Sequence, residues 1–555
     1  MIHLALCWHF HQPDYRSEDG EYFLPWTYLH AIKDYADMAA HLEAHPNMRA
    51  VVNFVPTLLE QLDDYAAQFA AGRIRDPFLA RLIDADLGRL DRAARKSLIE
   101  DCFRLNAPTM LDPFPGYRRL RTAWDTLRES ETGADYFSGA FLADLVTAYH
   151  LAWTGESVRR AHPWLVDLLE RGGDYSLADR QRLFDLIGRL IAGIVPRFRA
   201  LEARGQIELS STPHSHPIAP LLLDFKAARA AKPFSALPEA AAYPGGAVRL
   251  GAHVEAAVTA HRDWFGKPPQ GMWPAEGGVS APALAALDAA GLRWAASGEN
   301  VLRHSLAAAG HDISRPCRWL LHPYRLDGQR LACFFRDDYL SDLIGFEYKT
   351  WFGEDAVRHF LHMVEERCRQ SSEANPLVTV ILDGENAWEY FPYNGWYFLD
   401  ALYRALDDHP AIRVTTFSEY LDFHPEAVRP LPGLVAGSWV YGDFSTWIGD
   451  DAKNRAWDLL CAAKTVYDAA IGELDADAAA AAELQLRSCE SSDWFWWFGD
   501  YNPTTSVEAF DRLYRAKLKR LYRLLHRAVP AELDRPLCHG GGPAEAGGVM
   551  RRGGT

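Results

Sequence analysis

The stretch from Pro376 to Trp388 constrains the fold of this chain more than any other. Six apolar or β-branched residues run from Leu377 to Leu382, and the run stops at Asp383-Gly384-Glu385-Asn386. A continuous apolar run of this length is typical of a strand buried on both faces in a parallel sheet. The Asp383 carboxylate then lies at the carboxyl end of that strand, where α/β barrels and open α/β sheets carry catalytic groups. Taken alone, the pattern supports two interpretations of Asp383 equally well: a catalytic carboxylate, or a cap on the helix that follows.

Length, charge and aromatic content narrow the class of ligand. The 555 residues are enough for a large core and for more than one domain. The net charge of -16 argues against a nucleic-acid or anionic-membrane partner, because either would require a basic surface. Aromatic residues make up 12% of the chain, include 18 Trp, and occur in clusters. A neutral polyhydroxylated ligand such as a sugar offers apolar ring faces on which such side chains can stack.

The cysteines and the chain start indicate the compartment. The eight cysteines form no CxxC pair, and several lie inside apolar segments, so we expect them to be reduced and mostly buried. The N-terminus has no basic leader and no small-residue cleavage site, and no stretch has the length and apolar character of a membrane span. These features predict a cytoplasmic protein. The oligomeric state is left open.

Strand-like and helical segments alternate seven or eight times along the first 430 residues. The expected strands are residues 2–8, 49–54, 206–210, 293–296, 330–335, 377–382 and 412–416, and Glu276 is expected at the end of a further short strand. This alternation implies a parallel sheet and favours a closed or nearly closed barrel, with a doubly wound sheet as the alternative. We therefore predict an α/β barrel domain over residues 1–430.

Three further regions follow from the same patterns. Residues 57–203 are nearly all helical in pattern and too long for a simple crossover, so we predict a helical insertion there. Residues 431–535 predict a C-terminal helical domain that completes the cleft. The Gly-rich tail, residues 536–555, is predicted to be disordered.

Polar side chains cluster at four of the predicted strand ends. The clusters are His9/His11/Gln12, His214/His216, Glu276 and Asp383/Glu385. In one barrel these ends converge on the same face, so Glu276 and Asp383 can face each other across a cleft. Cleavage of a glycosidic bond requires such a pair. One carboxylic acid protonates the leaving oxygen, and the other carboxylate attacks the anomeric carbon or activates water.

Each candidate has a simpler alternative. Glu276 would also suit the N-terminus of the helix that follows it. A metal site built from His9, His11, Asp14 and a later carboxylate is conceivable, although hydrogen bonding to sugar hydroxyls is favoured. Core packing accounts for part of the Trp494–Phe498 run but not all of it, because successive side chains point in different directions. Glu385 and Asn386 are most simply turn residues or supporting partners of Asp383.

Five motifs, in order along the chain, resemble those of glycoside hydrolase family 57, in the branch with amylopullulanases and related α-glucan amylases. The motifs are His11-Gln12-Pro13, Gly205–His216, Met272–Ser280, Leu382–Asn386 and, more weakly, Thr415–Tyr420. The segment Ser492–Trp497 is also similar to that branch. Together these segments reach across residues 3–500.

The resemblance implies an incomplete (β/α)7 TIM-like barrel followed by a C-terminal α-helical bundle. It implies retaining double displacement on α-glucans (starch, glycogen, pullulan or maltooligosaccharides) without a cofactor or metal. Glu276 would be the nucleophile and Asp383 the general acid/base, about 5–5.5 Å apart. The residues expected to bind substrate are His11, Gln12, Glu208, His214, His216, Trp273, Trp388, Asp443, Asp493 and Trp494.

Two points depart from that pattern or remain open. The alternation contains one strand more than a seven-stranded barrel needs, so one short strand is expected to lie outside it. The same residues also suit a 4-α-glucanotransferase or a branching enzyme, because only the acceptor differs. A metal-dependent sugar hydrolase or deacetylase and a non-catalytic glycan-binding protein are further alternatives. The preference between α-1,4 and α-1,6 bonds is left open.

Overall fold

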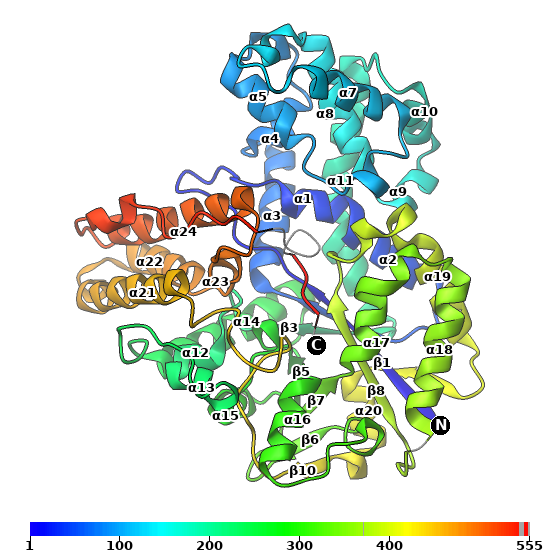
Figure 1. The fold of residues 1–555 in the computed structure, drawn as a ribbon, viewed down its shortest axis with the longest axis vertical. Helices are drawn as coiled ribbons and strands as arrows, with labels where there is room; N and C mark the ends of the chain where they lie inside the picture. Colours follow the sequence, from blue (N-terminus) through cyan, green and yellow to red (C-terminus); the bar gives the residue numbers. More distant parts are fainter. Residues whose placement is uncertain (370, 543–548, 553–555) are drawn as a thin grey trace.

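The protein is built around a curled, mostly parallel sheet (Figure 1). The structure is a computed structural model that describes residues 1–369, 371–542 and 549–552. The strands are β1 (Ile2–Phe10), β2 (Ala50–Phe54), β3 (Ile207–Ser211), β4 (Gly271–Met272), β5 (Trp294–Gly298), β6 (Tyr324–Leu326), β7 (Ala332–Arg336), β8 (Leu377–Asp383), β9 (Ile412–Thr415) and β10 (Arg429–Leu431).

Seven of the described strands form one continuous parallel series, in the order β7-β5-β4-β3-β2-β1-β8. The two outer strands of this series approach each other, because the backbone N–H of Asp337, just after β7, donates a hydrogen bond of 2.7 Å to the carbonyl of Thr379 in β8. The sheet therefore curls into an incomplete (β/α)7 barrel, as predicted, and not into a doubly wound sheet.

The surplus strand of the sequence pattern is β9. It pairs with Ile2–Ala5 at the start of β1, whereas Cys7–Phe10 at the end of β1 pair with β2. Because β8 pairs with nearly the whole of β1, β2 and β9 share the opposite edge of β1. Strands β6 and β10 add an outer edge in which β6 runs antiparallel to β7. The seven series strands thus carry their carboxyl ends on the face away from β9.

Helices cover the barrel between successive strands. They are α1 (Trp26–His30), α2 (Ala36–Ala44), α12 (Ala219–Leu223), α13 (Ala228–Ala231), α14 (Gly246–Phe265), α15 (Ala281–Ala289), α16 (Glu299–Ala308), α17 (Asp338–Asp342), α18 (Gly353–Arg369), α19 (Trp396–Asp407) and α20 (Phe417–Phe423). Helix α14 begins after Gly245 and ends at Gly266, and both glycines have positive φ (67° and 81°), the left-handed backbone that glycine adopts most readily.

Between β2 and β3 the chain forms helices joined by loops, and most of them make up the upper lobe of the molecule in Figure 1, with α3 and α11 reaching down toward the sheet. The helices of this segment are α3 (Pro56–Ala71), α4 (Pro77–Arg81), α5 (Arg92–Asp101), α6 (Ala107–Met110), α7 (Pro115–Leu127), α8 (Gly139–Ala152), α9 (Glu156–Ala161), α10 (Pro163–Arg171) and α11 (Leu177–Ala203). Ser176 and Asp179 form a capping box at the start of α11, which then leads back into β3.

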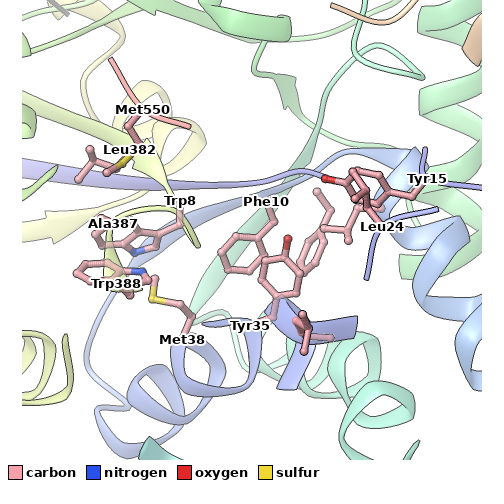
Figure 2. Packing of buried hydrophobic residues seen from close by; sticks show 14 of the residues in the cluster. Trp8, Phe10, Tyr15, Leu24, Tyr35, Met38, Leu382, Ala387, Trp388 and Met550 are labelled. Atoms are coloured by element: carbon pink, nitrogen blue, oxygen red, sulfur yellow. The ribbon is translucent and has the colours of Figure 1, made fainter. Parts of the chain in front are cut away.

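The C-terminal region is a group of helices beside the barrel, coloured orange to red in Figure 1. Its helices are α21 (Asp451–Ala470), α22 (Ala476–Cys489), α23 (Asp493–Trp497) and α24 (Thr504–Leu524). The described parts of the tail, residues 536–542 and 549–552, lie against the rest of the molecule, and Met550 is buried beside Leu382 (Figure 2). Residues 543–548 and 553–555 of the predicted disordered tail lie outside the described residues.

Packing in the core accounts for two residues of the Pro376–Trp388 stretch, Gly384 and Trp388. A Cβ atom at Gly384 would lie 1.8 Å from Cε1 of Phe10, so no side chain fits there without moving that ring. The Trp388 indole is buried, donates a hydrogen bond of 2.9 Å to the Gly384 carbonyl, and packs on Trp8 with ring centroids 5.8 Å apart (Figure 2). Trp388, expected to bind substrate, is therefore a core residue.

The state of the cysteines and the character of the helices concern the chain as a whole. All eight cysteines are free thiols, and six of them are buried. Among the described residues, no helix combines the length and the apolar character needed to cross a bilayer.

Candidate active site

Glu276 lies just beyond β4 in a constrained turn. Its φ of 58° falls in the left-handed region, which a Glu residue adopts only when its surroundings enforce it. The residue is 9% exposed. Its Oε2 accepts a hydrogen bond of 3.1 Å from Trp439 Nε1, and its Oε1 accepts one of 3.4 Å from Ser492 Oγ. The Glu276 carboxylate is therefore held by two residues that follow the barrel in sequence.

Asp383 is the last residue of β8 and is paired in register with His9 of β1. Its Oδ2 accepts a hydrogen bond of 2.9 Å from Asn386 Nδ2. Asp383 and Glu276 line the same cavity, which has a volume of about 480 Å³. The structure thus brings the two predicted carboxylates to one site.

Burial displaces the pKa values of both carboxyl groups. It raises the pKa of Glu276 to about 8, and the negative charge of Asp383 adds to this rise. Burial also raises the pKa of Asp383 to about 6, against the opposing effects of the Asn386 hydrogen bond and of His11 and Arg336. At neutral pH the pair therefore holds one protonated and one ionised carboxyl group.

Three histidines line the cavity as a stack. The rings of His11 and His216 lie 3.9 Å apart at 18°, and His9 Nε2 is 3.2 Å from His216 Nε2. Burial and the neighbouring His11 lower the pKa of His9 to about 3, and burial also holds the pKa of His216 well below its usual value. His9 and His216 are therefore neutral, and their other ring nitrogens are held by Asn53 at 2.7 Å and by Ser492 at 2.8 Å, respectively.

One group of residues in the described chain has the geometry to hold a metal ion. Ligand atoms of His11, His216 and Asp493 lie within 4.8 Å of one another. His11 Nε2 and Asp493 Oδ1 are already joined by a hydrogen bond of 2.8 Å. Asp14, part of the metal site considered from the sequence, instead forms ion pairs with Arg16 (2.7 Å) and Lys517 (2.8 Å).

Four of the ten residues expected to bind substrate line the cavity. They are His11, Gln12, His216 and Asp493. Gln12 Nε2 and the backbone N–H of His11 both donate to Glu385 Oε1, at 3.4 and 3.2 Å. Burial holds the pKa of Glu385 well above its usual value, and Glu385 supports this edge of the cavity by accepting both hydrogen bonds.

The other six expected residues are placed outside the lining of the cavity. They are Glu208, His214, Trp273, Trp388, Asp443 and Trp494. Glu208 accepts hydrogen bonds from Trp294 Nε1 (2.6 Å) and from Ser418. His214 bonds to Glu60 at 2.8 Å. Their polar atoms are thus engaged within the protein.

Trp388 packs in the core, as described above, and the last three of the six residues lie behind or beside the cavity. Trp273 is fully buried and packs edge-on against Trp439, with ring centroids 5.2 Å apart. Trp494 is fully buried and donates to the Ser488 carbonyl at 2.9 Å. Asp443 caps a turn by accepting a hydrogen bond of 2.7 Å from the backbone N–H of Ser445.

The aromatic wall of the cavity includes Trp439, Trp496 and Trp497, which come from the segments before α21 and within α23. Trp496 and Trp497 belong to the aromatic run Trp494–Phe498 of the sequence, whereas Trp439 was not singled out. The clustering of aromatic residues was the available signal, but it did not indicate which rings face the cavity. The insertion contributes further lining residues that no motif marked. These are Arg104, Leu105, Asn106 and Trp153.

The cavity combines two carboxyl groups at or just after the ends of β4 and β8, neutral histidines and an aromatic wall, and a pair of carboxyl groups is what cleavage of a glycosidic bond requires. The family model of glycosyl hydrolase family 57 matches residues 5–432. The protein belongs to glycosyl hydrolase family 57.

Solved structures share this fold at low sequence identity. The chain is similar to a GH57 branching enzyme from Thermococcus kodakaraensis, with 17% identity and a TM-score of 0.55 over 96% of this chain and 92% of that one. It is similar to a GH57-type branching enzyme from Pyrococcus horikoshii, with 14% identity and a TM-score of 0.57 over 100% and 99% of the two chains. It is also similar to the α-amylase AmyC from Thermotoga maritima, with 14% identity and a TM-score of 0.57 over 94% and 92%. At these identities the similarity establishes the fold.

Proposed function

We propose that the protein cleaves α-glucans by a retaining double displacement, with Glu276 as nucleophile and Asp383 as general acid/base. The observation that carries this proposal is the shared cavity in which the pKa values of the two carboxyl groups lie near 8 and 6. One proton is then available for the leaving oxygen and one carboxylate is available for attack at neutral pH. The family supports an α-glucan substrate, and so does the similarity in fold to two branching enzymes and an α-amylase.

The reaction has two steps. In the first, Glu276 bonds to the anomeric carbon while the bond from that carbon to the glycosidic oxygen breaks, and Asp383 gives its proton to this oxygen, which leaves as a sugar hydroxyl. In the second, Asp383 takes a proton from water or a sugar hydroxyl, whose oxygen attacks the anomeric carbon and releases Glu276. The first step requires an ionised Glu276, which the hydrogen bonds from Trp439 and Ser492 favour.

The substrate-free protein holds the shared proton on Glu276, whose pKa is the higher of the two. A bound glucan places a glycosidic oxygen beside Asp383, where a protonated carboxyl group can donate a hydrogen bond to it. We infer that substrate binding therefore moves the proton from Glu276 to Asp383 and so forms the reactive state.

The Glu276→Ala variant tests the proposal. We expect its rate on soluble starch and pullulan to fall by about 10³ or more, with an unchanged circular-dichroism spectrum. Glu354→Ala, an exposed carboxylate on α18, is the matched control. Wild-type rates in Glu276→Ala would rule out its assignment as nucleophile. Glucan binding without turnover in the unaltered protein would favour a non-catalytic glycan-binding protein.

A transferase, either a 4-α-glucanotransferase or a branching enzyme, is the second candidate. Trp439, Trp496 and Trp497 give the cavity an apolar wall on which an acceptor sugar can stack in place of water. Product analysis on maltoheptaose separates the candidates. Longer or branched products indicate transfer, and glucose or shorter oligosaccharides alone indicate hydrolysis. Parallel digests of starch and pullulan distinguish an amylase from an amylopullulanase.

The free cysteines bear on where this reaction takes place. Eight free thiols support action in a reducing compartment, and we propose the cytoplasm.

A further inference from the structure

A second cavity, with a volume of about 670 Å³, adjoins the active-site cavity. Five residues line both: Leu24, Trp26, Arg104, Thr505 and Ala509. The two cavities therefore meet along a common border. The second cavity extends from this border and is lined by residues of the insertion, of the segment before α1, and of helix α24. We call it the outer groove.

Phe23 and Arg512 form a flat surface in the outer groove. The Arg512 guanidinium lies over the Phe23 ring, 4.0 Å from its centroid. Phe23 is half-buried and Arg512 is exposed. Within the described residues no carboxylate lies within ion-pair distance of Arg512, so its N–H groups are not engaged by an ion pair. A planar guanidinium stacked on an aromatic ring offers both an apolar face and hydrogen-bond donors.

The charges of the outer groove are balanced. Four arginines and four carboxylates line it. Arg104 pairs with Asp101 at 3.4 Å, and Arg515 pairs with Asp511 at 2.7 Å. A phosphate or another anion would favour an excess of arginine. A mixture of paired acids and bases beside aromatic rings instead suits the hydroxyl groups and ring faces of a neutral carbohydrate.

We propose that the outer groove binds the part of an α-glucan chain that extends beyond the sugar units held at Glu276 and Asp383. This inference rests on the proposed function and adds a chain-length preference to it. A short oligosaccharide fits within the active-site cavity and never reaches Phe23 or Arg512. A long or branched glucan crosses the common border at Trp26 and gains the contacts of the outer groove.

Substitutions in the outer groove test this proposal without touching the catalytic residues. Phe23→Ala and Arg512→Ala are each assayed on maltotriose and on amylose. We expect kcat/KM for amylose to fall about tenfold, which is the loss of one good contact, while kcat/KM for maltotriose stays unchanged. Phe234→Ala, a 98% exposed ring outside both cavities, and Arg523→Ala, on the same helix as Arg512, are the matched controls.

A binding measurement keeps the test independent of turnover. Each outer-groove substitution is combined with Glu276→Ala, and calorimetry measures the Kd for a long maltooligosaccharide and for maltotriose. A weaker Kd for the long ligand alone supports the outer groove even where the wild-type protein cleaves no glucan, an outcome that would refute only the proposed function. Equal effects on both lengths, or none on either, would overturn the inference.

Discussion

Trp439 Nε1 donates a hydrogen bond of 3.1 Å to Oε2 of Glu276, and the Trp439 backbone N–H donates to the Glu276 carbonyl at the same distance. The two residues are 163 positions apart in sequence. The segment that follows the barrel thus fixes both the side chain and the backbone of the proposed nucleophile. Trp439 is itself wedged between Trp273 and the guanidinium of Arg336.

This relationship predicts the effect of Trp439→Phe. The variant keeps the ring but loses the donor, and a hydrogen bond to a charged group contributes about 1.5–3 kcal/mol. We expect kcat to fall by about 10- to 100-fold and the melting temperature to change little. Trp351→Phe, at an exposed position outside the cavity, serves as control. An unchanged kcat would mean that Glu276 does not depend on this donor.

The roles of the two carboxylates can be separated with an activated substrate. An aryl glycoside with an acidic phenol needs no proton on its leaving oxygen. We therefore expect Asp383→Asn to lose activity by about 10²–10⁴ on maltooligosaccharides but to keep rapid aryl release in a single turnover. Glu276→Gln should lose both reactions. If the two variants respond in the opposite way, the assigned roles are reversed.

The pH dependence of kcat/KM should be bell-shaped. Below about 6 both carboxyl groups are protonated and no nucleophile remains, and above about 8 both are ionised and no proton is available. The optimum therefore lies between these values. Trp439→Phe should shift the alkaline limb of the profile to higher pH, because loss of the hydrogen-bond donor raises the pKa of Glu276. A kcat/KM that stays constant from pH 5 to 9 would contradict a mechanism that depends on the ionisation of Asp383 and Glu276.

Glu490 should contribute strongly to stability. Its fully buried carboxylate pairs with Arg249 at 2.8 Å and with His253 at 2.7 Å, and it also accepts from Tyr243. Removing one partner of a buried ion pair costs about 3–5 kcal/mol, so Glu490→Ala should lower the free energy of unfolding by that amount. Glu473→Ala breaks an exposed ion pair with Arg527 and should cost less than about 1 kcal/mol.

The same carboxylate predicts a pH dependence of stability. Burial acts to raise the pKa of Glu490, but Arg249 and His253 outweigh it and hold the pKa at about 2. Because the folded-state pKa is depressed, the stabilisation is fully present above the unfolded value of about 4.3 and is lost as pH falls toward 2. Urea unfolding of wild type and Glu490→Ala should therefore converge in acid. If the difference in free energy of unfolding between wild type and Glu490→Ala stays constant down to pH 2, the ionised Glu490 carboxylate is not the source of the stabilisation.

Metal chelation should leave activity intact, whereas added Zn²⁺ should inhibit. The ligand atoms of His11, His216 and Asp493 lie close enough to hold a transition metal in the space that we assign to the sugar. Competitive inhibition by Zn²⁺ that is weakened in His11→Gln is the expected result. Loss of activity on exhaustive chelation, restored by metal, would instead support a metal-dependent sugar hydrolase or deacetylase.

Local patterns predicted β8 well, because a buried parallel strand requires an uninterrupted apolar run and β8 has one. They were poor guides to which motif residues face the cavity. Trp388 and Trp494 lie inside matching motifs, yet both pack in the core. The orientation of a buried ring depends on packing partners outside its own motif, such as Trp8 for Trp388 and Tyr514 for Trp494.

The sequence by itself determined the alternation of strands and helices, the helical insertion, and the presence of carboxylates at two strand ends. These features depend on local periodicity and on residues that terminate strands. Tertiary structure alone decided that Trp439 and Ser492 hold Glu276, that Asp493 meets His11, and that Arg512 stacks on Phe23. The physical reason is that burial sets both the pKa values of a site and its contacts, and burial arises only when distant segments pack together.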